Sequence, residues 1–221
     1  MVSHEVTSST TLSDEQLLAY VHTMALEGVA RLETVGTGPA DISQWADEAL
    51  VNGAKNMPVP SLETLPPGLS DTVSRIGELL AAHCIRFDVD EKEPHKSGED
   101  LKSHIDTLSG PCVASLVIPI SGPEAIFAMS QDHFVYPFDV APQGVRTFTY
   151  GVGQAALVRE RAFNGRSSAE ETIRTLNCLP HAGWHEEQPR VLAFANFFSS
   201  KAYDLSDGKV SPFNLRILTK K

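Results

Sequence analysis

The pattern of apolar and polar positions divides the chain near residue 84. Before this point, apolar residues recur at the three- and four-residue spacing of a helix with one buried face. The clearest case is the stretch 14–34, whose apolar positions are Leu17, Leu18, Val21, Ala25, Val29 and Leu32. Ser13 and Gln16 form a capping-box pattern at its start. The pattern therefore predicts a helix over 14–34, ended by the Gly36–Gly38–Pro39 stretch.

Two shorter helices are expected over 41–50 and 70–83. Between them, the segment 52–68 contains four prolines, Pro58, Pro60, Pro66 and Pro67. Proline lacks the backbone N–H that helices and central strands require. We therefore expect this segment to be a loop that covers part of the core.

From Cys84 onward the pattern becomes that of β-strands. Apolar and polar residues alternate from Cys84 to Asp90, and further short apolar runs follow, separated by Gly-, Pro- and Asn-rich turns. These runs are 113–120, 125–129, 134–138, 147–150, 155–161, 173–179, 191–198 and 215–218. Many short strands preceded by helices predict an α+β, mainly β protein. We expect a double-stranded β-helix (jelly-roll) core over 84–221, with an N-terminal helical layer over 1–83 packed on it, as one structural domain overall.

Composition narrows the classes of function. The 221 residues carry a formal net charge of −10 and a pI near 5.2, which argues against binding to a nucleic-acid backbone. Three widely spaced cysteines, Cys84, Cys112 and Cys178, favour reduced thiols over a disulfide framework. The sequence lacks an apolar stretch of membrane-spanning length and an apolar signal core at its start. We expect a cytoplasmic protein that binds neither nucleic acid nor membranes.

The candidate chemistry begins at His104 and Asp106. Residues two apart on a strand point to the same face, roughly 6.6 Å apart, so an imidazole and a carboxylate there can converge on one ion. A facial iron site with two histidines and one carboxylate needs a third ligand from elsewhere in the chain. His181 is the preferred candidate, His185 competes with it, and His133 is a lesser alternative.

Arg190 follows His181 by nine residues and precedes the apolar run 191–198. An arginine that enters a protein interior there would be costly to bury unless it met an anion. A dicarboxylate offers one, through a two-pronged charge-assisted hydrogen bond. The alternative is a solvated charge at the end of a strand.

These features resemble the iron(II)/2-oxoglutarate-dependent oxygenases. That superfamily has a His-x-Asp motif, a long interval, a distal histidine and, about ten residues later, an arginine or lysine that opens the last strand. The resemblance covers about 84–198, including the strand 85–89 and the turn that precede His104. It implies that His104, Asp106 and His181 bind iron(II), and that Arg190 binds the distal carboxylate of 2-oxoglutarate.

The resemblance also implies an activity: a dioxygenase that uses iron(II), 2-oxoglutarate and molecular oxygen to hydroxylate or desaturate a small molecule. An amino acid or a secondary-metabolite intermediate is the expected kind of substrate, and Trp184 and Arg86 are candidate substrate-binding residues. Three alternatives stay open. They are a cupin-like metal enzyme without 2-oxoglutarate, a dealkylase or prolyl-hydroxylase-like enzyme acting on a macromolecule, and a non-catalytic jelly-roll binding module.

Overall fold

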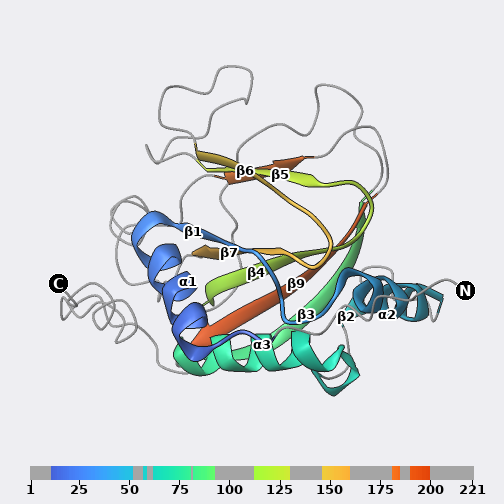
Figure 1. The fold of residues 1–221 in the computed structure, drawn as a ribbon, viewed down its shortest axis with the longest axis horizontal. Coiled ribbons are helices and arrows are strands. Elements are labelled where there is room, and N and C mark those ends of the chain that lie inside the picture. The colour runs from blue at the N-terminus through green and yellow to red at the C-terminus, as the bar shows by residue number, and fades with distance from the viewer. Residues whose placement is uncertain are drawn as a thin grey trace, which may run out of the picture.

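The described part of the protein consists of helices and two antiparallel β-sheets (Figure 1). The computed structural model describes residues 11–51, 57–58, 62–80, 82–92, 112–129, 146–159, 181–184 and 190–199. The helices are α1 (Asp14–Glu27), α2 (Pro39–Val51), α3 (Pro67–Leu79) and a short 3-10 helix (Leu62–Thr64). The strands are β1 (Val29–Leu32), β2 (Met57–Pro58), β3 (Ala82–Lys92), β4 (Cys112–Ser121), β5 (Ala125–Met129), β6 (Arg146–Tyr150), β7 (Ala155–Arg159), β8 (His181–Trp184) and β9 (Arg190–Ser199). None of the described helices is long and apolar enough to cross a membrane.

The start of α1 is as predicted, and its end is not. Ser13 caps the helix through a complete capping box with Gln16. The helix ends at Glu27, because Gly28 adopts a left-handed conformation with φ of 89° and turns the chain. The residues that follow form β1, which pairs antiparallel with β7. The prediction of a helix to residue 34 is therefore wrong, since the apolar residues of 29–32 belong to a strand.

The other two helices are displaced slightly from their predicted bounds. The second covers Pro39–Val51 and the third Pro67–Leu79, each with a proline as its first residue. The segment 52–68, predicted to be a loop, contributes β2 to the edge of a sheet and includes the start of α3. The predicted end of the third helix at residue 83 is wrong, because β3 begins at Ala82.

The larger sheet has the strand order β1-β7-β4-β9-β3-β2, and the smaller sheet the order β6-β5-β8. The strands predicted at 113–120, 125–129, 147–150 and 191–198 are confirmed, with ends that shift by one residue at most. The strand predicted at 155–161 is confirmed over 155–159, and its last two residues lie outside the described residues. The strand at 84–90 is confirmed within the longer β3. The strands predicted at 134–138, 173–179 and 215–218 lie outside the described residues.

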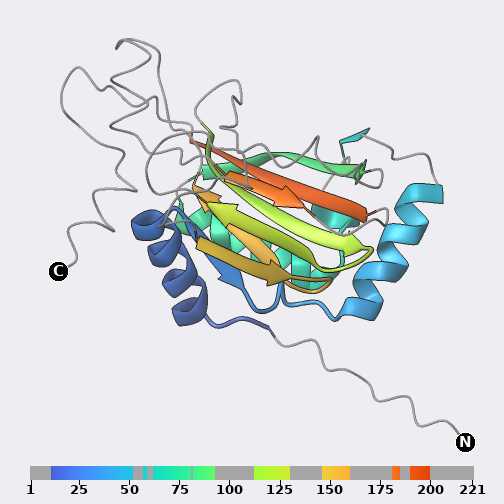
Figure 2. The ribbon, with the colours of Figure 1, turned by 90° about the horizontal axis from the view of Figure 1, so that it is seen from above.

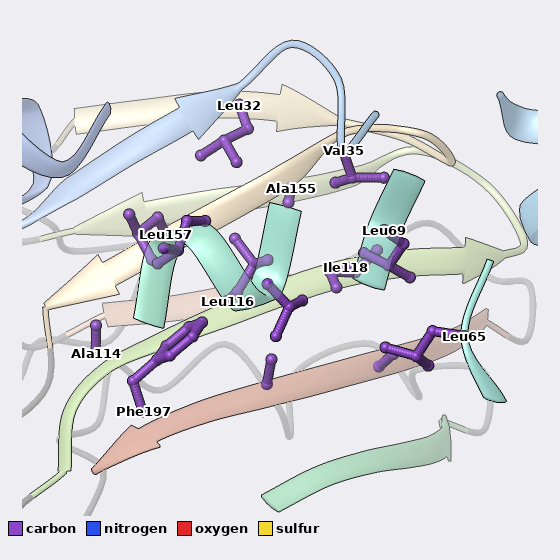
Figure 3. Packing of buried hydrophobic residues seen from close by; sticks show 14 of the residues in the cluster. Leu32, Val35, Leu65, Leu69, Ala114, Leu116, Ile118, Ala155, Leu157 and Phe197 are labelled. Atoms are coloured by element: carbon purple, nitrogen blue, oxygen red, sulfur yellow. The ribbon is translucent and has the colours of Figure 1, made fainter. Parts of the chain in front are cut away.

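The main hydrophobic core lies between the helices and one face of the larger sheet. Alternate residues of the central strands, such as Leu116 and Phe197, lie in one buried cluster with Leu69 of α3 (Figure 3). Burial of each such large side chain stabilises the fold by about 1.5–3 kcal/mol relative to exposure. Figure 2 shows α1 and α2 flanking the sheets at opposite ends. The helices thus cover one face and leave the other for the smaller sheet.

The second face of the larger sheet packs against the smaller sheet (Figure 1). A separate buried cluster joins Val29, Ala156 and Val158 of the larger sheet to Phe127 and Tyr150 of the smaller one. We call the two surfaces that meet here the inter-sheet faces.

Candidate functional site

Arg190 is a buried cation on the inter-sheet face of β9. The residues Val191, Ala193, Ala195 and Phe197 belong to the helix-side core. Because side chains alternate along a strand, the even-numbered positions from Arg190 to Asn196 lie on the opposite, inter-sheet face. Arg190 is only 6% exposed, so the solvated alternative considered from the sequence is wrong. A buried guanidinium is costly unless its charge is paired.

Tyr150 is the last residue of β6 in the smaller sheet, and it interacts electrostatically with Arg190. Burial raises the pKa of Tyr150 to about 12, while the positive charge of Arg190 acts in the opposite direction. The two side chains are therefore close enough to interact electrostatically. With this pKa, Tyr150 keeps its proton at neutral pH and offers a neutral hydroxyl beside a permanent positive charge.

An aromatic cluster surrounds the tyrosine on the inter-sheet face of the smaller sheet. The rings of Phe127 and Phe148 stack with centroids 5.3 Å apart, and Tyr150 meets Phe148 edge-on at 5.7 Å. Packed aromatic rings keep water away and lower the local dielectric. Any charge interaction with Arg190 is strengthened in such surroundings.

The register of β8 places His181 on the same inter-sheet face. Gly183 is opposite Phe127, and His181 is opposite Met129, in the antiparallel pairing with β5. Positions directly opposite each other share a face, as do positions two apart on one strand. Trp184 is opposite Ile126 and thus occupies the other face of β8.

The pairings also fix how far apart these positions lie along the strands. Tyr150 is opposite Ala125, four residues from Met129, the partner of His181. At about 3.3 Å per residue this is roughly 13 Å along the sheet. Val191 is opposite Ser121, beside the connection from β4 to β5. Arg190 and Tyr150 therefore mark the end of the sheets at this turn, and His181 lies farther along.

A polar pair interrupts the apolar surface nearer the other end of the larger sheet. Ser115 of β4 and Asn196 of β9 are directly opposite each other, and both are buried. The Ser115 hydroxyl donates to Asn196 Oδ1 over 2.6 Å. Arg86 of β3 is opposite Asn196 on the far side, so the three positions form one row across adjacent strands.

Two of the three predicted metal ligands, His104 and Asp106, lie outside the described residues, as do the alternatives His185 and His133. Within the described part, no three His, Cys, Asp or Glu residues gather as a metal site. The assignment of His181 as the third ligand stays a prediction, and its backbone position is compatible with it.

Sequence reasoning missed Tyr150 and the Ser115–Asn196 pair. Tyr150 carried one signal, since it ends a predicted strand on the same face as Phe148 and directly precedes Gly151. The sequence held no signal for the Ser115–Asn196 pair, because strand alternation alone does not say which residues of distant strands are opposite each other.

Three solved structures with the same fold illustrate the comparisons. AviO1 from Streptomyces viridochromogenes Tue57 is 15% identical, with a TM-score of 0.51 over 88% of this chain and 99% of that chain. The non-heme alpha ketoglutarate dependent epimerase SnoN from nogalamycin biosynthesis is 12% identical, with a TM-score of 0.51 over 85% of each chain. A Pseudomonas putida prolyl-4-hydroxylase is 12% identical, with a TM-score of 0.52 over 90% of this chain and 99% of that chain.

These likenesses establish a shared fold, and at this level they confirm the resemblance expected from the sequence. No protein-family model matches the sequence, and no curated protein does.

Proposed function

We propose that this protein is an iron(II)- and 2-oxoglutarate-dependent dioxygenase with a jelly-roll core, and that it hydroxylates or desaturates a small molecule. The observation that carries the proposal is the buried Arg190, which shares its surroundings with Tyr150 of the facing sheet. Alpha ketoglutarate dependence in SnoN, which has the same fold, supports it.

Arg190 and Tyr150 suit the distal carboxylate of 2-oxoglutarate. A guanidinium can bind both oxygens of a carboxylate through two parallel charge-assisted hydrogen bonds. A phenol that stays protonated adds a third donor without adding charge. The buried cation and the neutral donor thus complement one monoanionic group, and the chemistry of the donors fits the co-substrate.

The metal would be held beyond this pair, by His181 together with His104 and Asp106. Two neutral imidazoles and one carboxylate on one side of iron leave positions open for small ligands. His181 lies on the inter-sheet face at some distance from Tyr150, as an elongated co-substrate between Arg190 and the metal requires. When bound, iron and 2-oxoglutarate together supply the activation of dioxygen for oxidation of a C–H bond.

The remaining task of the chain is to orient the co-substrate and exclude water. Arg190 would hold one end of the dicarboxylate, and His181, farther along the same face, would belong to the metal site. The rings of Phe127, Phe148 and Tyr150 keep the surroundings dry, so the charge of Arg190 is poorly screened. Preorganised donors in a dry site need little rearrangement when the ligand binds.

A small-molecule substrate, such as an amino acid or a secondary-metabolite intermediate, fits the acidic chain. A net charge of −10 disfavours a polyanionic substrate. SnoN, with the same fold, belongs to nogalamycin biosynthesis.

The proposal is tested by incubating the purified protein with iron(II), ascorbate and 2-oxoglutarate and measuring succinate. We expect succinate formation that requires both iron and 2-oxoglutarate, at a slow basal rate without added substrate. Tight iron binding with no consumption of 2-oxoglutarate would instead support the cupin-like alternative. Absence of iron binding at micromolar concentrations would support the non-catalytic module.

A further inference from the structure

The side chain of Gln154 closes the turn between β6 and β7. The N–H of Gly151 donates to Gln154 Oε1 at 2.9 Å, and the backbone N–H of Gln154 donates to the carbonyl of Gly151 at 3.0 Å. Two reciprocal hydrogen bonds thus join the ends of the turn. They restrain a glycine, which otherwise leaves the backbone unusually free.

The turn is also anchored beside the larger sheet. The carbonyl of Gly153 accepts from the N–H of Val35, a fully buried residue just after β1, at 2.9 Å. Gln154 Nε2 donates to Glu33 Oε2 at 3.3 Å. The amide of Gln154 therefore uses its oxygen within the turn and its nitrogen on the segment that follows β1.

The bond from Gly151 acts directly on Tyr150. The N–H of Gly151 belongs to the peptide group that joins it to Tyr150, and this group is planar. A hydrogen bond to that N–H therefore restrains the direction in which the chain leaves Tyr150. Tyr150 is the last residue of β6 and is paired there with Ala125. Pairing with β5 thus holds the residue itself, and Gln154 holds the peptide group that follows it.

The turn crosses from one sheet to the other. β6 belongs to the smaller sheet and β7 to the larger one, so the shape of the turn sets where Tyr150 lies relative to the larger sheet. Arg190 belongs to the larger sheet, and its charge acts on Tyr150. Two groups that share one ligand must be held to within about 0.5 Å of their working geometry. The turn is therefore the place where this geometry can be set.

We propose that Gln154 is a positioning residue of the co-substrate site, which holds Tyr150 in place beside Arg190. This inference rests on the proposed function and deepens it, because it names the contact that prepares one of the two carboxylate-binding groups. Gln154 acts through Tyr150 and not by touching the co-substrate. A residue that only stabilised the turn would influence folding without this link to Tyr150.

The test is a titration of 2-oxoglutarate into the full chain loaded with manganese(II) under nitrogen. Gln154→Met keeps the length of the side chain and removes both hydrogen-bonding groups. We expect it to weaken 2-oxoglutarate about threefold, within the range for one neutral hydrogen bond. In the Tyr150→Phe background the same substitution should change the affinity by less than about 1.5-fold, because the two residues act through one contact. Manganese affinity should stay within about twofold throughout.

Gln44→Met is the matched control. Gln44 Nε2 donates to Glu48 Oε1 at 3.1 Å on the exposed side of α2, so the substitution removes a similar amide–carboxylate contact elsewhere. It should leave the affinity for 2-oxoglutarate unchanged.

An exchange of the two polar partners tests the contact itself. Gln154→Glu places a second carboxylate beside Glu33 and should weaken 2-oxoglutarate binding as Gln154→Met does. Adding Glu33→Gln restores a carboxylate–amide pair with the roles reversed, and the carboxylate at position 154 still accepts from Gly151. The ion pair of Glu33 with Arg31 is lost as well, but it is exposed and long, at 3.4 Å, and contributes little. We expect the double variant to recover the wild-type affinity to within about 1.5-fold.

Ionisation of Tyr150 gives a measurement that needs no ligand. Phenolate absorbance is recorded directly after a jump to pH 11, and the signal of the matching Tyr150→Phe protein is subtracted. With a pKa of about 12, about one tenth of the Tyr150 side chains should be ionised in the wild type. Gln154→Met should raise this fraction at least twofold, because burial is the main cause of the raised pKa and a displaced Tyr150 is less buried.

The inference is overturned by an unchanged 2-oxoglutarate affinity in Gln154→Met, by an equal loss in the Tyr150→Phe background, by an unchanged phenolate signal or by failure of the exchanged pair to recover affinity. If Gln154→Met does not fold, Gln154→Asn replaces it, since its side chain is one methylene shorter and too short to reach both partners. A wild type that does not bind 2-oxoglutarate contradicts the proposed function and this inference together. Wild-type binding combined with any of the other results overturns this inference alone.

Discussion

Arg190 and Tyr150 approach each other from facing sheets, and the positive charge of Arg190 acts on the ionisation of the buried Tyr150. The arginine opens the long central strand β9, and the tyrosine closes β6 at the turn before β7. Arginine is rarely buried in a protein interior unless its charge is paired. Their meeting in a dry, aromatic environment supports a binding place for one carboxylate.

Replacement of Arg190 by glutamine should raise the concentration of 2-oxoglutarate needed for half-maximal binding. A charge-assisted hydrogen bond contributes about 1.5–3 kcal/mol, which corresponds to a weakening of roughly 10- to 150-fold. Iron affinity should stay within about twofold, because Arg190 is not a ligand. Titration with each ligand separately measures both effects, and Arg31→Gln on β1 is the matched control. Equal losses for iron and 2-oxoglutarate would point to misfolding rather than to a lost carboxylate contact.

Replacement of Tyr150 by phenylalanine should weaken 2-oxoglutarate binding less, by roughly 2- to 10-fold, as expected for one neutral hydrogen bond. The ring stays, so the contacts with Phe127 and Phe148 are retained. An unchanged affinity would remove Tyr150 from the carboxylate site and leave Arg190 to act without it.

The same variant should change how stability depends on alkaline pH. The folded-state pKa of Tyr150 is about 12 against an unfolded value of 10.0. Because the folded pKa is the higher one, stability from this group is complete below pH 10 and is lost as pH rises toward 12. Urea unfolding at pH 8 and pH 11.5 should show the wild type losing about 2 kcal/mol more than Tyr150→Phe. Parallel losses in both proteins would mean that the phenol is not buried.

Substitution of Gly68 by alanine should destabilise the fold, although alanine is the better helix former by about 1 kcal/mol. A Cβ at Gly68 would overlap the carbonyl oxygen of Gly36, which turns the chain with φ of 79°. Thr72 also donates to the carbonyl of Val35 at 3.0 Å, so α3 is docked closely here. We expect a net loss of about 2 kcal/mol in chemical unfolding.

Gly151→Ala is the control for this substitution, because its Cβ would meet Glu124 Cγ at an ordinary 3.4 Å. Its stability should stay within about 0.5 kcal/mol of the wild type. A Gly68→Ala protein as stable as this control would show that α3 can move away from Gly36.

Local patterns predicted much of the fold. The capping box at Ser13 and the apolar runs of β4 and β9 are short-range signals, and these three elements begin within a residue of where they were expected. The predicted helix over 14–34 is wrong beyond residue 27 for a physical reason. Gly28 adopts a left-handed conformation that ends the helix, and the spacing of apolar residues does not indicate this turn. The spacing of Val29 and Leu32 suits a helix, yet these residues gain their contacts by pairing with β7.

The candidate site was predictable only in part. Arg190 and His181 were predicted as site residues because their spacing resembles a known motif, and their roles stay predictions. Tyr150 and Asn196 depend on which strands become neighbours, and that follows from the packing of the whole chain. Arg86 was predicted to bind substrate; its backbone pairs with Asn196, and the role stays a prediction.

The most direct test of the account is an anaerobic titration of iron(II) into the protein with 2-oxoglutarate, followed by visible absorbance. We predict a weak charge-transfer band in the wild type that is lost in His104→Ala, Asp106→Ala and His181→Ala. The band should persist in His22→Ala, a substitution within α1, and in His185→Ala. If the band survives His181→Ala but disappears in His185→Ala, His185 rather than His181 is the third iron ligand. A band that survives both His104→Ala and His181→Ala would contradict the proposed metal site.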